Sequence, residues 1–416
     1  MFDNPEKTLY FSILFIIGSK MKISSKSVIV SFVILFILHQ NSFAQIIAAP
    51  VKTKKGWGYI KSDQTWLIEP FYDRFWHDGM YVVAEDKGES VLCEYHEGFA
   101  SFRRGEKWGF FDEKGMVAIK NAFSDVRDFH DSVAAVKIKG KWGFIDKNGH
   151  FIIEPKFEEV RSFFNGWAAV MTRNKWGFIN KQGELVIPEK YSQVRNNTGH
   201  LIAVKQNNKW GFIDQSGSIV FDFQFEDAFN FSNGFARVQK EGLWGFMNTS
   251  GTISIHHRFE KTFPFNDHIA RVKLDGMWAY CDTSGNIIGN KKYLNAEEFA
   301  DGVARVRSAT GWGYITPDGT FIIQPRYDFA GDFSYGIGRV KIIKSEVFGI
   351  QAGDWKYLNK KGEFLFNNLK IEKAEDFSNG FGRVRIDGRW GFIDTNGTVV
   401  LAPQFENCLD FTNIIK

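Results

Sequence analysis

Tryptophan recurs along this chain at a nearly constant interval, and this interval constrains the fold more than any other feature. The six intervals between Trp108 and Trp312 are all 34 residues long. The recurring residues are Trp57, Trp108, Trp142, Trp176, Trp210, Trp244, Trp278, Trp312, Trp355 and Trp390. A fixed period of this length indicates an array of about ten small units rather than two or three large domains.

Three intervals depart from the period. The first is 51 residues, the one after Trp312 is 43, and the last is 35. The two longer intervals place insertions near residues 85–97 and 343–353. We therefore predict one repeat array over residues 45–416, interrupted by these two segments.

Within each unit the sequence is typical of short strands. The stretch AAVKIKGKWGFID, from Ala134 to Asp146, has two runs rich in Val, Ile, Trp and Phe around a Lys-Gly-Lys turn. It therefore predicts a β-hairpin. Asp146 and Gly149 bracket a tight turn, and residues 151–153 form a third strand. No segment shows sustained helical periodicity, so the class is all-β.

We predict that the units are three-stranded and antiparallel, and that they form an open, twisted solenoid or superhelix. Propeller blades usually carry four strands and number four to eight, which disfavours the alternative of a closed, propeller-like ring. The chain ends at Lys416, before the last unit reaches its return strand. Either the terminus caps the array or the last unit is completed elsewhere.

The aromatic content is high, with 43 Phe and 13 Trp in 416 residues. Three Trp residues lie outside the 34-residue series but still fall in repeat register. Trp66 matches Phe151, Trp167 matches Phe235, and Trp76 matches Phe163 after a shortening. This register predicts core residues rather than platforms for stacking sugars. A unit this small buries its aromatics only by stacking on a neighbour.

The recurring string [KR]WG[FY][ILM][DN]xxG resembles the WG β repeats of the WG-containing repeat family. Four occurrences are KWGFIDKNG (141–149), KWGFINKQG (175–183), GWGYITPDG (311–319) and RWGFIDTNG (389–397). Two units depart, with Ala279 and Lys356 in place of the Gly after Trp. The resemblance covers nearly all of the chain after Gln45. It implies an array of β units, commonly exported or in large modular bacterial proteins, without general catalytic activity.

The N-terminal region predicts export. From Met21 the chain has a basic segment with Lys22 and Lys26, an apolar run, and a small-x-small site before Gln45. The apolar run is shorter than the ~20 residues of a membrane-spanning helix. We predict an upstream mis-start segment at 1–20 and a signal peptide at 21–44, cleaved near Ala44–Gln45. The mature chain would be periplasmic, cell-surface or secreted, without a membrane span.

A search for catalytic chemistry finds little. GxSxG, HExxH, CxxC and phosphate-binding loop motifs are missing from the sequence. His256 and His257 would point to opposite faces of a strand, which disfavours joint metal binding. The Asp residues four positions after Trp are explained by turns, and an odd number of cysteines argues against a disulfide framework. We predict no enzyme activity, catalytic residue, metal or cofactor.

One pattern is not required by packing. Seven and five residues before Trp, the early units have the pairs Ala135/Lys137, Ala169/Met171 and Ala203/Lys205, and the later units are more basic. The later residues are Arg237, Arg271, Lys273, Arg305, Arg307, Arg339, Lys341, Arg383 and Arg385. One interpretation is a salt-bridge ladder to the acids sixteen after each Trp, namely Glu158, Glu226, Glu260, Asp328 and Glu406. The other is a basic stripe that binds an anionic partner.

The sequence as a whole favours an exported, non-enzymatic repeat scaffold that binds proteins or other envelope macromolecules. A glycan- or cell-wall-binding module, with anionic recognition through the basic stripe, is the first alternative. A hydrolase with a site in the first insertion is weaker. Export and a net charge of +4 disfavour a nucleic-acid partner. The sequence leaves the oligomeric state open.

Overall fold

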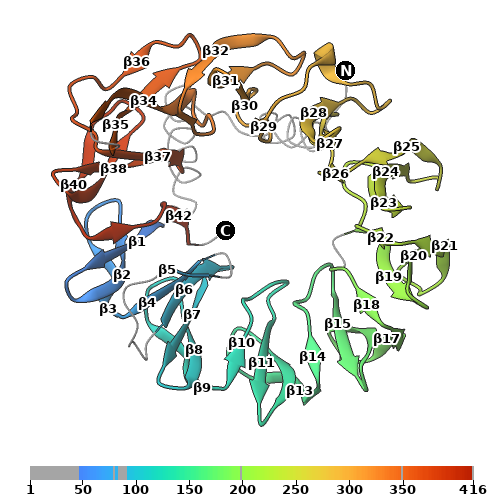
Figure 1. Ribbon diagram of the computed structural model, residues 1–416. Helices are drawn as coiled ribbons and strands as arrows, with labels where there is room; N and C mark the ends of the chain where they lie inside the picture. The colour runs from blue at the N-terminus through green and yellow to red at the C-terminus, as the bar shows by residue number, and fades with distance from the viewer. Residues whose placement is uncertain (1–45, 78–79, 83–90, 197–198, 348–349, 415–416) are drawn as a thin grey trace, which may run out of the picture. The chain divides into compact units, whose positions relative to one another are not determined.

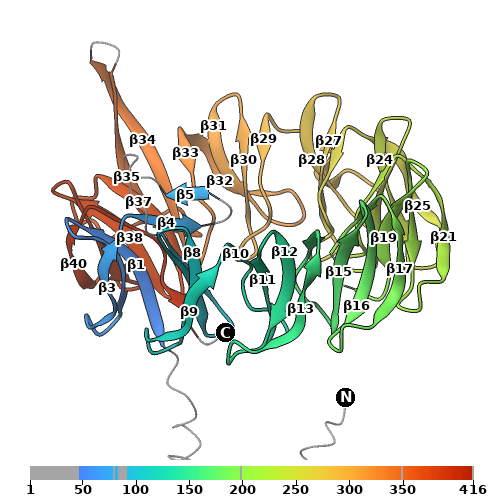
Figure 2. The same ribbon diagram turned by 90° about the horizontal axis from the view of Figure 1, so that it is seen from below.

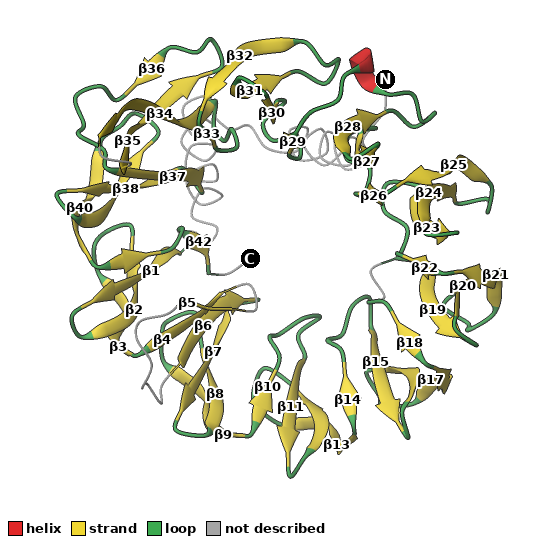
Figure 3. Cartoon of the chain, in the orientation of Figure 1, coloured by secondary structure: helices red, strands yellow, loops and turns green. Residues whose placement is uncertain are grey.

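Ten small β-sheets follow one another around a ring (Figure 1 and Figure 3). The computed structural model describes residues 46–77, 80–82, 91–196, 199–347 and 350–414. The predicted mis-start segment and signal peptide lie outside these residues, as does part of the first insertion. The ring belongs to one compact unit, Ile46–Lys416. We number the sheets as blades 1–10 in chain order.

Blade 3 shows the common plan. A two-residue inner strand, β10 (Asp125–Val126), pairs with β11 (Ala134–Ile138), which pairs with β12 (Lys141–Ile145) and then with the outer strand β13 (Phe151–Phe157). All three pairings are antiparallel. The predicted hairpin and third strand are confirmed, and the short inner strand is additional. This blade therefore has four strands rather than the predicted three.

Five other blades have the same strand order. They are blade 4, β14 (Glu159–Val160), β15 (Trp167–Thr172), β16 (Lys175–Asn180) and β17 (Leu185–Tyr191); blade 5, β18 (Gln193–Val194), β19 (Ile202–Gln206), β20 (Lys209–Ile213) and β21 (Ile219–Phe225); blade 6, β22 (Asp227–Ala228), β23 (Phe235–Lys240), β24 (Leu243–Asn248) and β25 (Ile253–Phe259); blade 8, β29 (Asn295–Ala296), β30 (Ala304–Ser308), β31 (Gly311–Ile315) and β32 (Phe321–Tyr327); and blade 10, β37 (Lys373–Ser378), β38 (Phe381–Ile386), β39 (Arg389–Asp394) and β40 (Val399–Phe405).

Blade 1 joins the two ends of the described chain. Its strands β1 (Ile47–Thr53), β2 (Gly56–Lys61) and β3 (Trp66–Tyr72) come from the start of the array. Its inner strand comes from the C-terminal end, where β41 (Asn407–Cys408) and β42 (Thr412–Asn413) both pair with β1. The missing return strand of the last unit is thus the missing inner strand of the first. This pairing closes the ring.

The two predicted insertions fall in blades 2 and 9. Blade 2 adds β4 (Arg74–His77) and β5 (Met80–Val82) beside its four strands β6 (Val91–His96), β7 (Phe99–Arg104), β8 (Lys107–Phe111) and β9 (Val117–Phe123). Blade 9 contains β33 (Phe329–Ala330) and β36 (Phe364–Leu365) around a long hairpin of β34 (Ile337–Val347) and β35 (Ile350–Asn359). This hairpin projects beyond its neighbours (Figure 2).

The Gly of each Trp-Gly pair is required by a close backbone approach. A Cβ atom on Gly143 would lie 2.6 Å from the Ile153 carbonyl oxygen and 2.7 Å from the Pro155 nitrogen of β13. The outer strand therefore crosses directly over this residue, and the register between β12 and β13 shifts there. Any side chain on Gly143 would push the outer strand away.

The two units that lack this Gly have reduced outer strands. Blade 7 pairs β26 (Lys261–Thr262), β27 (Ala270–Leu274) and β28 (Met277–Cys281) as a three-stranded sheet that includes Ala279. A short 3-10 turn, η1 (Ile288–Asn290), follows where other blades have the outer strand. In blade 9, which has Lys356, the outer strand β36 is two residues long. Both substitutions therefore coincide with a local loss of the outer strand.

Hydrophobic cores lie between consecutive blades. One core joins Trp142 and Phe144 of blade 3 with Val170 and Ile179 of blade 4. Another joins Val51 and Ile60 of blade 1 with residues of the C-terminal end, namely Phe392, Leu401, Phe405, Cys408 and Phe411. Each blade thus buries its apolar face on the next, and blade 10 buries its own on blade 1.

The prediction of an open solenoid is wrong, and the fold is a closed ring of ten blades. Two physical facts explain the error. In blades 3–9 the inner strands are only two residues long, too short to show a strand pattern in the sequence. The closing contact joins residues more than 350 positions apart, such as Val51 with Cys408, which no local pattern reveals.

We predict that Gly143→Ala lowers the free energy of unfolding by about 1–3 kcal/mol, because the new methyl group collides with the backbone of β13. Hydrogen exchange should report faster exchange at residues 151–157. The matched control is Ala279→Gly, which removes a methyl group from the same position in blade 7 and should leave exchange in that blade unchanged. Unaltered protection of β13 in Gly143→Ala would contradict the prediction.

We also predict that Val51→Cys forms a disulfide with the native Cys408. The two residues face each other across the closing strands, and both are fully buried. Leu409 N–H donates to the Pro50 carbonyl at 2.9 Å, which makes 51 and 408 a non-hydrogen-bonded pair with closely spaced Cα atoms. Peptide mapping after mild oxidation should find this cross-link. Pairing of residue 51 with Cys93 or Cys281 instead would argue against the closure.

Candidate functional site

Five of the predicted basic residues reach from one blade to the next. Arg237, Arg271, Arg305, Arg339 and Arg383 occupy matching positions on the second strand of blades 6–10. Each donates from Nη1 to a carbonyl oxygen on the inner strand of the following blade. The acceptors are Thr262 at 2.9 Å, Ala296 at 2.5 Å, Ala330 at 2.8 Å, Ala374, and Cys408 at 2.7 Å, respectively.

Four of these arginines also bind carboxylates of the following blade. The Nε distances are 3.0 Å from Arg271 to Glu298, 2.7 Å from Arg305 to Asp332, 2.7 Å from Arg339 to Asp376 and 2.5 Å from Arg383 to Asp410. Arg271 and Arg339 bind a second carboxylate through Nη1, namely Glu297 and Glu375, both at 2.6 Å. A planar guanidinium satisfies several acceptors at once, which suits this junction.

These ion pairs are largely shielded from solvent. The four guanidinium side chains are 10–19% exposed. Burial raises the pKa of Asp376 in spite of the opposing effect of Arg339, and it raises the pKa of Glu298 in spite of Arg271. The arginines therefore serve as connections between blades, and a partner would have to displace an internal acid to reach them.

The ladder of internal ion pairs exists, but the predicted acids mostly do not form it. Glu226 and Glu260 accept the backbone N–H of Gly242 at 2.8 Å and of Gly276 at 2.7 Å, both in hairpin turns. Glu158 likewise accepts from Asn174. The acids that bind the arginines lie about twenty residues after Trp rather than sixteen. Which acids meet the arginines depends on how one blade packs on the next, and this packing is a tertiary feature.

The residues five positions before Trp are more accessible. Arg307 is exposed, and Lys273, Lys341 and Arg385 are half-buried. Arg385 lies 3.8 Å from Glu372. The prediction that the nine basic residues bind an anionic partner stays a prediction. Because four of the nine already bind internal carboxylates, the residues that could still contact such a partner are those five positions before Trp, together with Arg237.

In blades 3–5, a different series of arginines connects each blade to the next. Arg127, Arg161 and Arg195, spaced by 34 residues, each place a guanidinium over the Trp of their own blade, at 5.0, 5.5 and 4.7 Å from the ring centroid. Arg127 then binds Glu159 of the next blade at 2.5 Å, and Arg195 binds Asp227 at 2.8 Å. Sequence reasoning missed this series, although its regular spacing was a visible signal.

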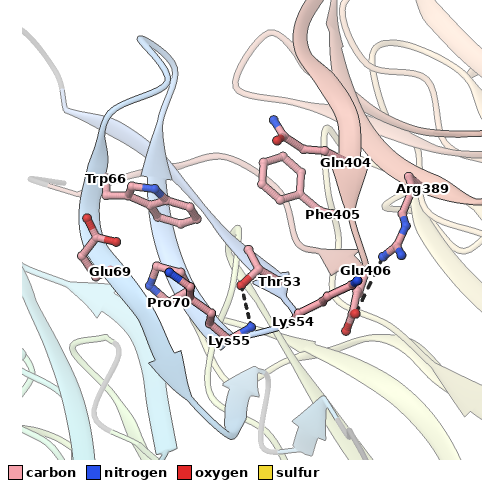
Figure 4. A pocket seen from close by; sticks show the side chains of 10 residues that line it. All are labelled: Thr53, Lys54, Lys55, Trp66, Glu69, Pro70, Arg389, Gln404, Phe405 and Glu406. Carbon is pink, nitrogen blue, oxygen red and sulfur yellow. Dashed lines mark hydrogen bonds and ion pairs between the residues drawn. The ribbon is translucent and has the colours of Figure 1, made fainter.

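A pocket of about 510 Å³ lies at the seam between blades 1 and 10 (Figure 4). Blade 1 contributes the hairpin turn at Lys54 and Lys55 and the outer strand with Trp66. Blade 10 contributes Arg389 and Phe405. The remaining lining residues are Thr53, Glu69, Pro70, Gln404 and Glu406. The Arg389 guanidinium lies 3.7 Å from Glu406, while the two lysines point apart, Lys54 toward Glu406 and Lys55 toward Pro70 (Figure 4).

Blade 3 has a smaller pocket at the same place in the repeat. Its volume is about 290 Å³, and its lining includes Lys139 and Lys141 of the hairpin turn and Phe151, Glu154 and Pro155 of the outer strand. Phe151 matches Trp66, and Glu154 and Pro155 match Glu69 and Pro70. The pocket is therefore a product of the repeat itself, enlarged where the last blade meets the first.

The other candidate groups are distributed without forming a shared centre. His256 is exposed and His257 half-buried on β25, which agrees with opposite orientations. Cys93, Cys281 and Cys408 are buried free thiols, and burial raises the pKa of Cys281 and Cys408 to about 12. Within the described ranges, no cluster of three His, Cys, Asp or Glu side chains has the geometry to hold a metal ion.

The closed ring of radially arranged sheets defines the class of the protein as a β-propeller, with ten blades. The model of the WG containing repeat matches nine consecutive segments, namely 108–142, 142–176, 176–210, 210–244, 244–278, 278–308, 312–342, 357–390 and 390–413. These matches span more than half of the chain, and the protein belongs to the family of WG containing repeat proteins.

Two solved structures that match the chain do so at low similarity. A eukaryotic initiation factor is 10% identical with a TM-score of 0.48, over 78% of this chain and 96% of that one. Hsv2p of Kluyveromyces lactis is also 10% identical, with a TM-score of 0.31 over 61% and 98%. No curated protein matches the chain. In the part of the chain that the structure describes, no helix is both long and apolar enough to cross a membrane.

The turn aspartates should make the stability of the fold depend on pH in the acidic range. The hydroxyl of Ser216 lowers the pKa of Asp214, against a smaller effect of desolvation, and the backbone N–H groups of Ser218 and Ser216 lower it further. Because the folded-state pKa is depressed, this carboxylate stabilises the fold above its unfolded-state pKa of about 3.9. That contribution is lost as pH falls toward the folded-state value.

We predict that Asp214→Asn weakens the loss of stability between about pH 5 and pH 3, because the variant takes up fewer protons on unfolding. Urea denaturation across this range measures the slope. Asn180 occupies the same turn position in blade 4, where its side chain accepts equivalent backbone bonds, so the substitution should be tolerated at neutral pH. An unchanged slope would contradict the role assigned to the carboxylate.

Proposed function

We propose that this protein is an exported, non-enzymatic scaffold that binds a protein or another macromolecule of the cell envelope at the rim of the propeller. The observation that carries the proposal is the recurrence of one pocket at homologous positions of blades 1 and 3. Each pocket sets hairpin-turn lysines beside apolar and aromatic side chains of the outer strand. Repeated pockets of one composition suit an extended partner that contacts several blades.

Three features support this assignment. The leader-like sequence before Gln45 favours export to the periplasm, cell surface or medium. The Trp residues of the repeats pack into the cores between blades, so they serve the fold rather than a reaction. The basic residues that lie outside the interblade ion pairs favour an anionic partner, as does the lysine pair at the seam.

A glycan-binding function is the second candidate, because Trp66 is one of the residues that line the seam pocket. An indole at a pocket wall can stack on a sugar ring. Trp66 is also in register with Phe151 and packs partly against the core of blades 1 and 10. Protein binding therefore remains the preferred proposal, and the same experiment distinguishes the two.

We predict that the chain captures a partner from envelope extract, and that the triple variant Lys54→Glu, Lys55→Glu, Arg389→Glu loses this partner. The charge reversal places repulsion at the pocket that should contact it. A matched variant reverses three exposed lysines that lie outside the pocket positions of the repeat, Lys114, Lys361 and Lys373, with the same change in net charge, and should retain the partner. The measurement is quantitative mass spectrometry of captured material at low and high salt.

A partner that resists protease and disappears after glycosidase treatment would favour the glycan-binding candidate. Equal capture by the triple variant and the matched variant would overturn the proposed seam site.

A further inference from the structure

The two arrangements of interblade arginines meet at blade 6. Arg195 of blade 5 and Arg237 of blade 6 both place their guanidinium groups on the ring of Phe229, at 4.2 and 3.8 Å from its centroid. Arg195 also binds Asp227 at 2.8 Å. Two cations therefore share one aromatic ring, and the one carboxylate in ion-pair contact there is bound to Arg195.

Arg237 occupies the same position as the later arginines but lacks their acid. Its Nη1 donates to the Thr262 carbonyl at 2.9 Å, as the others do to the matching carbonyls. Twenty residues after Trp278, Trp312 and Trp390 stand Glu298, Asp332 and Asp410, whereas Pro264 stands twenty residues after Trp244. Among the described residues, no carboxylate is in ion-pair contact with Arg237.

The charge state of the two kinds of arginine differs accordingly. Burial, and then the neighbouring cation of Arg195, lower the pKa of Arg237 to about 10. Burial also acts to lower the pKa of Arg383, but the carboxylate of Asp410 offsets it and the pKa is raised. Arg237 is still charged at neutral pH, and its positive charge is incompletely neutralised.

A second polar group at this junction also lacks a partner. Thr262 occupies the inner-strand position that is Ala296 in blade 8 and Ala330 in blade 9. Its side chain is 3% exposed, and its Oγ1 finds no hydrogen-bond partner in the described part of the chain. A buried hydroxyl without a partner is costly, which is typical of a site completed by another molecule.

We propose that Arg237 binds a carboxylate supplied from outside the chain, namely an aspartate or glutamate side chain of a protein partner. The other blades show the geometry that such a group would adopt, with a carboxylate oxygen 2.5–3.0 Å from the arginine Nε. Pro264 is exposed, so the position of the missing acid is open to solvent. This inference rests on the proposed binding function for its partner, but it concerns a separate site.

A protein carboxylate is favoured over a uronic acid because every occupied position is filled by an Asp or Glu side chain that follows shortly after an inner-strand carbonyl. The inner strand that precedes each acid also supplies the carbonyl oxygen that accepts a hydrogen bond from the arginine Nη1. An acidic peptide reproduces the charge and the spacing of that group, whereas a sugar ring would have to fit beside Phe229 and Pro264.

The test uses the full chain and labelled hexa-aspartate, with hexa-asparagine as the uncharged probe, in fluorescence anisotropy. Pro264→Asp supplies the internal acid that the other blades have, so it should weaken hexa-aspartate binding by about tenfold. Pro264→Asn makes the same backbone change without the charge and should bind like the native chain. Asp332→Asn frees Arg305 and should strengthen binding by creating a second site.

Equal binding by Pro264→Asp and Pro264→Asn would overturn the proposal, as would a lack of hexa-aspartate binding at low salt. Binding of polygalacturonate without binding of the peptide would also overturn it. Suppose that Pro264→Asp weakens hexa-aspartate binding, while the triple variant at the seam pocket and its matched variant capture the partner equally. This result would uphold the site at Arg237 and reject the proposed seam site. The opposite result would uphold the seam site and reject the carboxylate site at Arg237.

Discussion

The packing of each blade on the next is the interaction on which the rest of the structure depends. A single blade has four short strands and exposes apolar faces on both sides, so its aromatic residues are buried only between neighbours. An open array would leave the two end faces in water. Pairing of β1 with β41 and β42 removes these ends, since the last residues of the chain complete the first blade. Closure is thus the physical consequence of stacking.

The Trp-Gly pair makes the blade compact. Trp packs into the interblade core, while the following Gly lets the outer strand cross at backbone contact distance. The natural substitutions at Ala279 and Lys356 coincide with a lost and a shortened outer strand, respectively. The inner and middle strands persist in both blades.

From blade 3 onward, two different series of arginines link each blade to the next. In blades 3–5 the guanidinium comes from the segment after the inner strand, and in blades 6–10 it comes from the second strand. Both arrangements place a cation beside an aromatic ring and an acceptor of the next blade. Where they meet, at Phe229, the arrangement is incomplete. A regular structure thus acquires a local difference in charge without a change of fold.

The sequence by itself determined the repeat length, the all-β class, the hairpin around Lys139–Gly140 and the turn at Asp146. These features depend on residues close in the chain, and local pattern reports them. Only the tertiary structure decided that the array closes, that a two-residue inner strand belongs to each of blades 3–9, and which acids meet Arg271 and Arg305. Strand pairs such as Val51 with Cys408, and ion pairs between blades, join residues that become neighbours only after the blades have stacked.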